Sequence, residues 1–203
     1  MQLKRYLANK SVAVVGNSQN LFSYEYGSEI DSHDIVIRMN RGIIIPLETS
    51  FGAKTNVWCY STFKLVKDIY QSYDCDYKVY MSPKDRILSA SQSNELFFPL
   101  VLWSRLHSNL EARPSVGAMV TYLLAQCNPS RVTIFGFDFK ASKSFYEKAN
   151  NTGSHNFLRE RELLQDFIER NNWVLKDCSR AYLMPTRRYR INTIFKKYFD
   201  MIA

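Results

Sequence analysis

Short apolar runs that end at a glycine or a polar residue mark the first part of the chain. Residues 12–15 are apolar and are followed by Gly16. Residues 35–39 are rich in β-branched side chains and are followed by Asn40. Two further apolar runs cover residues 57–60 and 78–81. Continuous runs of this length, bounded by turn-forming residues, predict buried β-strands.

The pattern changes from residue 114 onward. A proline and Ser115 precede residues 116–127, which are apolar on all sides and predict a buried helix with Ser115 near its N-cap. Residues 132–135 predict another strand, and residues 156–171 carry an apolar stripe on a charged background, which predicts an amphipathic helix. Residues 173–175 predict one more strand.

Two segments give weaker signals. Residues 96–103 are apolar but interrupted by Pro99, so we expect a loop or an edge element. Residues 140–154 are polar and include an Asn-Asn-Thr-Gly run, which predicts a mobile loop. The alternation of strands and helices predicts an α/β fold, with a largely parallel central sheet flanked by helices and a single domain over residues 1–203.

Composition changes this picture little, but the charge distribution adds to it. The chain has 203 residues, of which 46% are hydrophobic and 23% charged, an ordinary globular composition, and its net charge is +8. Six basic residues lie between Asp177 and Asp200, and the rest of the chain is nearly neutral. The basic, aromatic segment 178–203 predicts either a closing helix with a solvated basic face or contact with an anionic membrane.

Cysteines and the N-terminal residues bear on the compartment. Four widely spaced cysteines form no CxxC pair, which argues against structural zinc and favours buried thiols in a reducing compartment. Residues 1–11 are polar and basic, and no apolar run approaches the roughly 20 residues of a membrane span. We therefore expect a cytoplasmic protein, with peripheral contact to a membrane as the alternative that stays open.

Three turns that follow predicted strands are candidates for ligand binding: 16–18, 39–41 and 136–138. In an open α/β sheet, ligands bind beyond the carboxyl ends of the strands, and glycine lets the backbone approach a phosphate. Each could equally be an ordinary turn. The sequence has no G-x-G-x-x-G and no P-loop lysine motif, which removes the main support for a dehydrogenase or an NTPase.

The chain has three histidines. His33 and His107 lie in polar surroundings that favour a structural or exposed role. His155 precedes the predicted helix 156–171, with Glu160 five positions on. An imidazole has the pKa needed to take a proton from a sugar hydroxyl near neutral pH, although a histidine at a helix start can also lack any such task.

Several of these segments together resemble the sialylmotifs of animal-type sialyltransferases, glycosyltransferase family 29. Residues 13–18, 26–34, 37–41 and 51–55 resemble the large motif, residues 114–117 running on to 135–137 the small motif, and His155 with Glu160 the very short motif. The resemblance covers residues 12–160, about three quarters of the chain.

The resemblance implies a Rossmann-like variant of the GT-A fold. It also implies an inverting transfer of sialic acid from CMP-sialic acid to an acceptor glycan or glycolipid, with no cofactor and no metal ion. His155 would be the catalytic base. The donor-binding residues would be Gly16, Asn17, Ser18, Asn40, Ser115, Val116, Gly117, Gly136, Phe137 and Tyr146.

The chain departs from the family pattern in the third motif. Residues 144–147 read Ser-Phe-Tyr-Glu, so Ser144 stands where the family has a histidine, and Tyr146 is a partial substitute. Val12 stands where the family has a disulfide cysteine. These departures leave alternatives open: a donor such as CMP-Kdo or another ulosonic acid, or a nucleotide- or nucleic-acid-binding protein without turnover. Nucleic acid is the less favoured partner because no RNA-binding signature is present.

Overall fold

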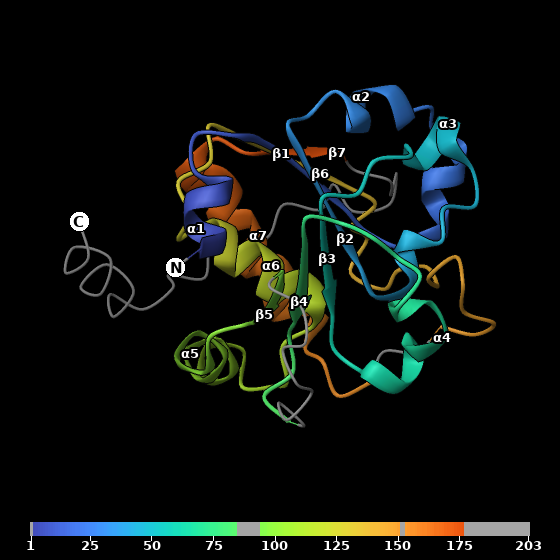
Figure 1. Cartoon of the computed structure of the whole chain (residues 1–203). Helices are drawn as coiled ribbons and strands as arrows, with labels where there is room; N and C mark the ends of the chain where they lie inside the picture. Colours follow the sequence, from blue (N-terminus) through green and yellow to red (C-terminus); the bar gives the residue numbers. More distant parts are fainter. Residues whose placement is uncertain (1, 85–93, 151–152, 177–203) are drawn as a thin grey trace.

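The computed structural model describes residues 2–84, 94–150 and 153–176. They form a seven-stranded, entirely parallel sheet in the order β5-β4-β3-β2-β1-β6-β7, with helices on both faces (Figure 1). The strands are β1 (Ser11–Val15), β2 (Ile35–Met39), β3 (Val57–Tyr60), β4 (Tyr77–Tyr80), β5 (Glu95–Phe97), β6 (Arg131–Phe135) and β7 (Val174–Lys176).

The central strands are apolar on both faces, as a covered parallel sheet requires. In β1, Val12 and Val14 pack into a large core on one face, whereas Ala13 and Val15 pack into a second core on the opposite face. All four side chains are at most 2% exposed. A continuous apolar run therefore serves two layers of helices, which explains why no alternating pattern marks this strand.

Helices from distant parts of the sequence cover each face (Figure 1). The larger core lies under the helices α1 (Gln2–Leu7), α5 (Leu100–Leu110), α6 (Val116–Leu124) and α7 (Phe157–Asn171). The other face is covered by α2 (Gly27–Asp31), α3 (Glu48–Phe51), α4 (Lys67–Tyr70) and the short 3₁₀ turns η1 (Gln19–Ser23), η2 (Asn40–Ile43) and η3 (Phe63–Leu65). The predicted α/β fold with a parallel central sheet is confirmed.

The strand order reverses between β1 and β6. The chain builds outward from β1 to β5 on one side and then returns through α5 and α6 to place β6 on the other side of β1. The carboxyl ends of these two strands lie at the point where the strand order reverses, which is where open α/β sheets bind their ligands. The turns that follow β1 and β6 are the predicted ligand turns 16–18 and 136–138.

Arg38 on β2 braces the segment that follows α3. Its guanidinium is completely buried and donates to the carbonyl oxygens of Phe51, Gly52 and Lys54 and to the hydroxyl of Thr55. Burial lowers the pKa of Arg38 to about 10, which still leaves it charged at neutral pH. Much of the first sialylmotif-like region thus serves to hold the sheet and its connections together.

The predicted elements differ from the structure at a few places. The edge element expected within residues 96–103 is present as the outermost strand, β5, but the start of α5 was not predicted there, because Pro99 sits at the N-cap of that helix rather than inside an element. Helix α1 was not predicted, since Leu3 and Leu7 are the only buried side chains it contributes. The expected mobile loop 140–154 is instead held by hydrogen bonds at least through Glu147, as described below. The basic segment 178–203 lies outside the described residues.

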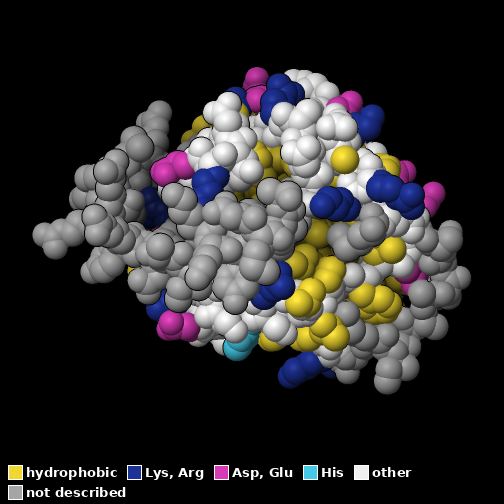
Figure 2. Space-filling model, turned by 90° about the vertical axis from the view of Figure 1, so that its left-hand side faces the viewer, with side chains coloured by type: hydrophobic (Ala, Val, Ile, Leu, Met, Phe, Trp, Pro, Cys, Tyr) yellow, Lys and Arg dark blue, Asp and Glu magenta, His cyan; other side chains and the backbone are white. Residues whose placement is uncertain are grey.

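The cysteines of the described residues are free thiols. Cys59 and Cys127 are buried free thiols and Cys75 is a half-buried one, while Cys178 is not among the described residues. Within the described ranges, no helix is both long and apolar enough to cross a membrane. Figure 2 shows the side of the molecule that carries α5, where hydrophobic side chains are exposed beside Lys and Arg; Leu100 and Val101 of α5 are 50% and 57% exposed.

Candidate functional site

A cleft of about 700 Å³ opens at the carboxyl ends of β1 and β6. All of the site residues predicted from the sequence line this one cleft: Gly16, Asn17, Ser18, Asn40, Ser115, Val116, Gly117, Gly136, Phe137, Tyr146 and His155. They come from segments up to 139 positions apart in the chain, so the fold, and not sequence proximity, brings them together. Residues 61–65 and 80–84 and the side chain of Trp103 form the rim farther out.

Two glycines allow the turns after β1 and β6 to touch. A Cβ atom at Gly16 would lie 2.3 Å from the carbonyl oxygen of Gly136, and a Cβ at Gly136 would lie 2.5 Å from the Leu21 side chain. Gly136 also has a φ of +67°, which side-chain-bearing residues rarely adopt. Neither position accepts a larger residue without displacing the backbone beside the cleft.

One side of the cleft, which we call the turn wall, comprises residues 16–18 and 136–147. The carboxylate of Asp138 accepts hydrogen bonds from the hydroxyls of Ser18 and Ser142 and from the backbone N–H groups of Lys140 and Ser142. Ser18 and Asp138 are 5% and 8% exposed. The Ser18 hydroxyl is therefore committed to the protein itself, so that any contact of Ser18 with a ligand falls to its backbone.

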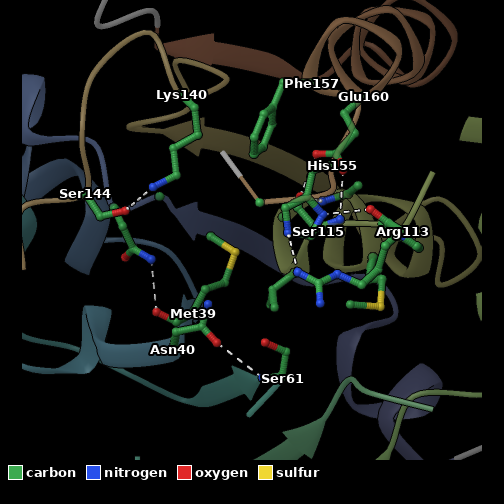
Figure 3. A pocket seen from close by; sticks show the side chains of 18 of the residues that line it. Met39, Asn40, Ser61, Arg113, Ser115, Lys140, Ser144, His155, Phe157 and Glu160 are labelled. Atoms are coloured by element: carbon green, nitrogen blue, oxygen red, sulfur yellow. Dashed lines mark hydrogen bonds between the residues drawn. The ribbon is translucent and has the colours of Figure 1, made fainter. Parts of the chain in front are cut away.

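Asn17 joins the two segments of the turn wall to the end of β2. Its side-chain NH₂ donates to the carbonyl oxygen of Met39 and to the phenolic oxygen of Tyr146, both at 3.1 Å. Burial raises the pKa of Tyr146 to about 12, so this phenol stays neutral and acts as a hydrogen-bonding group. Asn40 follows β2 with a φ of +50° and accepts from the backbone N–H of Ser61 at 3.2 Å, which fixes its amide at the floor of the cleft (Figure 3).

Lys140 presents an ammonium group in the turn wall that sequence reasoning did not find. Phe139 and Lys140 have φ values of +51° and +63°, two consecutive left-handed residues that are not glycine, a conformation that is costly outside functional sites. The Nζ of Lys140 donates to the hydroxyl of Ser144 at 2.9 Å and pairs with the carboxylate of Glu147 (Figure 3). A lysine in an irregular loop carries no signal in one sequence, which is why it was missed.

The opposite side of the cleft, which we call the helix wall, comprises residues 113–117 and 155–160. Ser115 is the N-cap of α6, and its hydroxyl accepts from the N–H of Ala118. The same residue donates twice to Glu160 of α7, from its N–H at 2.8 Å and from its hydroxyl at 2.6 Å. Glu160 thereby ties the start of α6 to the first turn of α7 (Figure 3).

Glu160 is 5% exposed, and its pKa is raised to about 7. Burial is the larger influence, and the two hydrogen bonds from Ser115 oppose it. Glu160 accepts from the N–H of Ser115, the N-cap residue of α6. The N–H groups of Val116 and Gly117 lie in the first helical turn, where no intrahelical acceptor exists, and both residues line the cleft.

Phe137 bridges the two walls. A Cβ atom at Gly117 would lie 3.0 Å from the Phe137 ring, so the glycine lets the ring lie directly against the start of α6. The ring is half-buried and lines the cleft, as an aromatic surface for a flat ligand would.

His155 is held in a single tautomer by Arg113. Its Nδ1 lies 2.7 Å from the carbonyl oxygen of Arg113, which can only accept, so Nδ1 carries the proton. Its Nε2 lies 3.3 Å from the Nη2 of Arg113, which can only donate, so Nε2 presents a lone pair. Both contacts require the same neutral form of the ring.

Electrostatics favour that neutral form. Burial lowers the pKa of His155, and the positive charges of Arg113 and Lys140 lower it further, against the raising effect of the hydrogen bond to the Arg113 carbonyl. The site therefore contains an unprotonated imidazole nitrogen that faces the cleft at neutral pH, which is what a general base requires.

The other two histidines lie where the sequence predicted. His33 is 1% exposed and bonds through its two ring nitrogens to the carbonyl oxygen of Glu29 and the hydroxyl of Thr133. His107 is exposed on α5 and stacks on Trp103. In the described part of the chain, no group of three or more His, Cys, Asp or Glu side chains could hold a metal ion.

The sequence of the chain matches a known family. Residues 4–98 match the model of glycosyltransferase family 29, described as sialyltransferase. Over 52 residues the chain is 48% identical to CMP-N-acetylneuraminate-beta-galactosamide-alpha-2,3-sialyltransferase 1 of Mus musculus, covering 26% of this chain and 15% of that protein. Over 54 residues it is 48% identical to beta-1,6-galactosyltransferase GALT29A of Arabidopsis thaliana, covering 27% of this chain and 13% of that protein. The matched segments thus span less than a sixth of either relative.

Solved structures extend the similarity of fold beyond the matched segment. A mammalian sialyltransferase superposes with a TM-score of 0.62 over 85% of this chain and 70% of its own, at 22% sequence identity. The sialyltransferase CstII of Campylobacter jejuni, in complex with cytidine-5'-monophosphate, superposes with a TM-score of 0.58 over 83% of this chain and 79% of its own, at 14% identity. The chain thus shares its fold with these two structures over more than four fifths of its length.

Proposed function

We propose that this chain, whose residues 4–98 match the model of glycosyltransferase family 29, the sialyltransferase family, transfers sialic acid from CMP-sialic acid to a hydroxyl group of an acceptor glycan, with inversion and without a metal ion. The observation that carries the proposal is His155. Its Nε2 lone pair faces a cleft at the switch point of the sheet, beside the anion-binding start of α6.

The two walls divide the reaction between them. The Nε2 of His155 takes the proton of the acceptor hydroxyl while the acceptor oxygen forms a bond to the anomeric carbon of the donor sugar. The bond from that carbon to the phosphate oxygen breaks, and the electron pair leaves with CMP. One displacement from the face opposite the leaving group inverts the anomeric centre.

The leaving phosphate needs positive groups, since its negative charge grows in the transition state. We assign this role to the ammonium of Lys140 on the turn wall, with the N–H groups of Val116 and Gly117 directed at the acidic sugar or its phosphate. Lys140 donates to Ser144, the position at which the family pattern has a histidine, so a cation from a neighbouring loop position serves the same end of the cleft. Phe137 and Gly136 would border the cytidine, and Asn17 and Asn40 would bond to the nucleotide.

The experiment that tests this function is calorimetric titration with CMP, CDP, UDP and CMP-sialic acid, followed by a transfer assay on galactose-terminated acceptors with and without EDTA. We expect selective micromolar binding of CMP and CMP-sialic acid, and product whose amount EDTA does not change. Binding of CMP without any product would favour a nucleotide-binding protein without turnover. An absence of cytidine binding would contradict the proposal.

A different donor is the second candidate. CMP-Kdo and other CMP-ulosonic acids carry the same phosphate and carboxylate as CMP-sialic acid. The similarity to a plant protein named beta-1,6-galactosyltransferase adds an activated galactose as a further donor to assay. We propose a cytoplasmic location, with the basic segment 178–203 as the contact to anionic membrane. Sedimentation with anionic vesicles before and after removal of that segment tests the membrane contact.

A further inference from the structure

Arg113 contacts both ring nitrogens of His155, one through its backbone carbonyl and the other through its side chain. Its backbone carbonyl holds Nδ1 of His155 at 2.7 Å, at a point fixed between the end of α5 and Pro114. Its guanidinium reaches Nε2 at 3.3 Å from an exposed side chain. The ring can therefore lose the guanidinium and keep its orientation, because the carbonyl contact does not depend on the side chain.

The guanidinium also blocks the atom that the reaction needs. A hydrogen bond from Nη2 occupies the lone pair of Nε2, and a positive charge at that distance opposes the formation of an imidazolium (Figure 3). An acceptor hydroxyl cannot donate to the same lone pair while Arg113 does. Arg113 has to leave before His155 can work.

Most of the donors of Arg113 are unused. A guanidinium has five N–H donors, and within the described residues only the bond to His155 engages one of them; no described carboxylate pairs with this side chain. Lys140, by contrast, is already paired with Glu147. Arg113 thus keeps the planar pair of donors that suits a carboxylate best.

We propose that Arg113 is the carboxylate-binding residue of the cleft, and that a carboxylate-bearing sugar draws its guanidinium away from Nε2 of His155 and so uncovers the base. The inference rests on the proposed function and adds to it a selection rule, since an uncharged sugar would leave the base covered. The carboxylate can come from the donor sugar or from an acidic acceptor; the chemistry at Arg113 is the same.

The test compares Arg113→Ala with the unaltered protein by calorimetry, using CMP and a non-transferable 3-fluoro analogue of CMP-sialic acid. We expect Arg113→Ala to bind CMP within twofold of the unaltered protein and to bind the analogue at least tenfold more weakly. Arg5→Ala, which removes an exposed charge on α1 away from the cleft, is the matched control and should change neither affinity.

A second readout follows the base itself, since the chain has only three histidines to assign by NMR. In the unaltered protein, the analogue should raise the pKa of His155, whereas CMP should not. In free Arg113→Ala, the pKa of His155 should be higher than in the free unaltered protein, and binding of the analogue should not change it. Arg113→Lys, which keeps the charge without the fork, should recover only part of the affinity.

The outcomes show whether the carboxylate belongs to the donor or to the acceptor. They also separate failure of the Arg113 proposal from failure of the proposed function. Unchanged binding of the analogue, together with lost preference for acidic over neutral acceptors in KM, would support the proposal with the acceptor as the source of the carboxylate. Normal CMP binding with no effect of Arg113→Ala on either substrate or on the pKa of His155 would overturn it and leave the proposed function intact. No cytidine binding in the unaltered protein would overturn both.

Discussion

The turn wall and the helix wall are built by different means. In the turn wall, Ser18, Asp138 and Ser142 are hydrogen-bonded to one another, and Lys140 is paired with Glu147. These side chains therefore hold the backbone of the wall in place. In the helix wall, Ser115 and Glu160 are committed in this way, whereas the Arg113 side chain meets His155 in one contact of 3.3 Å. A binding surface gains from being fixed in advance, whereas a reactive group must be able to exchange partners.

The largest effect should come from the helix wall. His155→Ala removes the base, and we expect turnover to fall by roughly 10³-fold, within the range for general bases, with CMP affinity within twofold. Turnover assays and calorimetry on the same preparation check both parts, and His107→Ala is the control. If CMP affinity fell as much as turnover, His155 would belong to the binding surface, and the distinction between the two walls would not hold.

On the turn wall, Lys140→Met should lower turnover by about 10²-fold, because it removes a positive charge from the leaving phosphate. CMP affinity should also fall, by roughly tenfold, since the same charge contacts the ground state. The control is Lys148→Met on the exposed end of the loop. Full activity of Lys140→Met would show that Lys140 only braces Glu147 and Ser144.

Glu160 should act on stability rather than on chemistry. Glu160→Gln replaces a carboxylate that accepts two hydrogen bonds from Ser115, and we expect a cost of about 1–3 kcal/mol in the free energy of unfolding. The pKa of this carboxyl is raised in the folded protein to about 7, so the folded state holds the proton more tightly than the unfolded chain. Its contribution therefore favours folding at low pH and is lost as the pH rises from about 4.5 through 7.

Thermal unfolding at several pH values measures this contribution. The unaltered protein should lose part of its stability across that window, and Glu160→Gln should show a flatter dependence. Identical curves for the two proteins would mean that Glu160 is ionised in the folded state as readily as in the unfolded chain.

The acid limb of the rate profile should reflect the tautomer of His155. Because burial and the charges of Arg113 and Lys140 lower its pKa, the neutral base persists below pH 6.5. We expect kcat/KM to rise with pH with a midpoint below pH 6.5, and this midpoint to move to higher pH in Arg113→Ala. A limb above pH 6.5 in the unaltered protein would assign the base to another group.

The smallest effect should be that of Tyr146→Phe. It removes a neutral phenol that accepts one hydrogen bond from Asn17, so turnover should change by less than tenfold and stability by about 1 kcal/mol. A loss of 10²-fold or more would assign the partial role of the missing histidine to Tyr146 instead of Lys140. Kinetics on both single variants and on the double variant separate the two.

The strands and the cleft-lining turns could be predicted because they depend on local pattern. An apolar run that ends in Gly16 or Gly136 carries its own signal, and the order of such turns along the chain predicts a shared edge of the sheet. Lys140, Arg113 and the bond between Ser115 and Glu160 could not be predicted, because each depends on contacts across 4 to 45 positions that no periodicity encodes. The family match ends at residue 98, before all of these residues, so the recognisable part of the sequence is mainly the part that builds the sheet.

The contact between Gly16 and Gly136 limits how the specificity of the cleft can be redesigned. The two turns meet backbone to backbone, so neither position offers a side chain to vary. Libraries that aim at a new donor should keep both glycines and place diversity at the exposed or half-buried residues 61–62, 64–65 and 82–84, which line the cleft and are not part of the buried cores. The donor selectivity of the cleft can then be altered at its rim while the Gly16–Gly136 contact within the turn wall is kept.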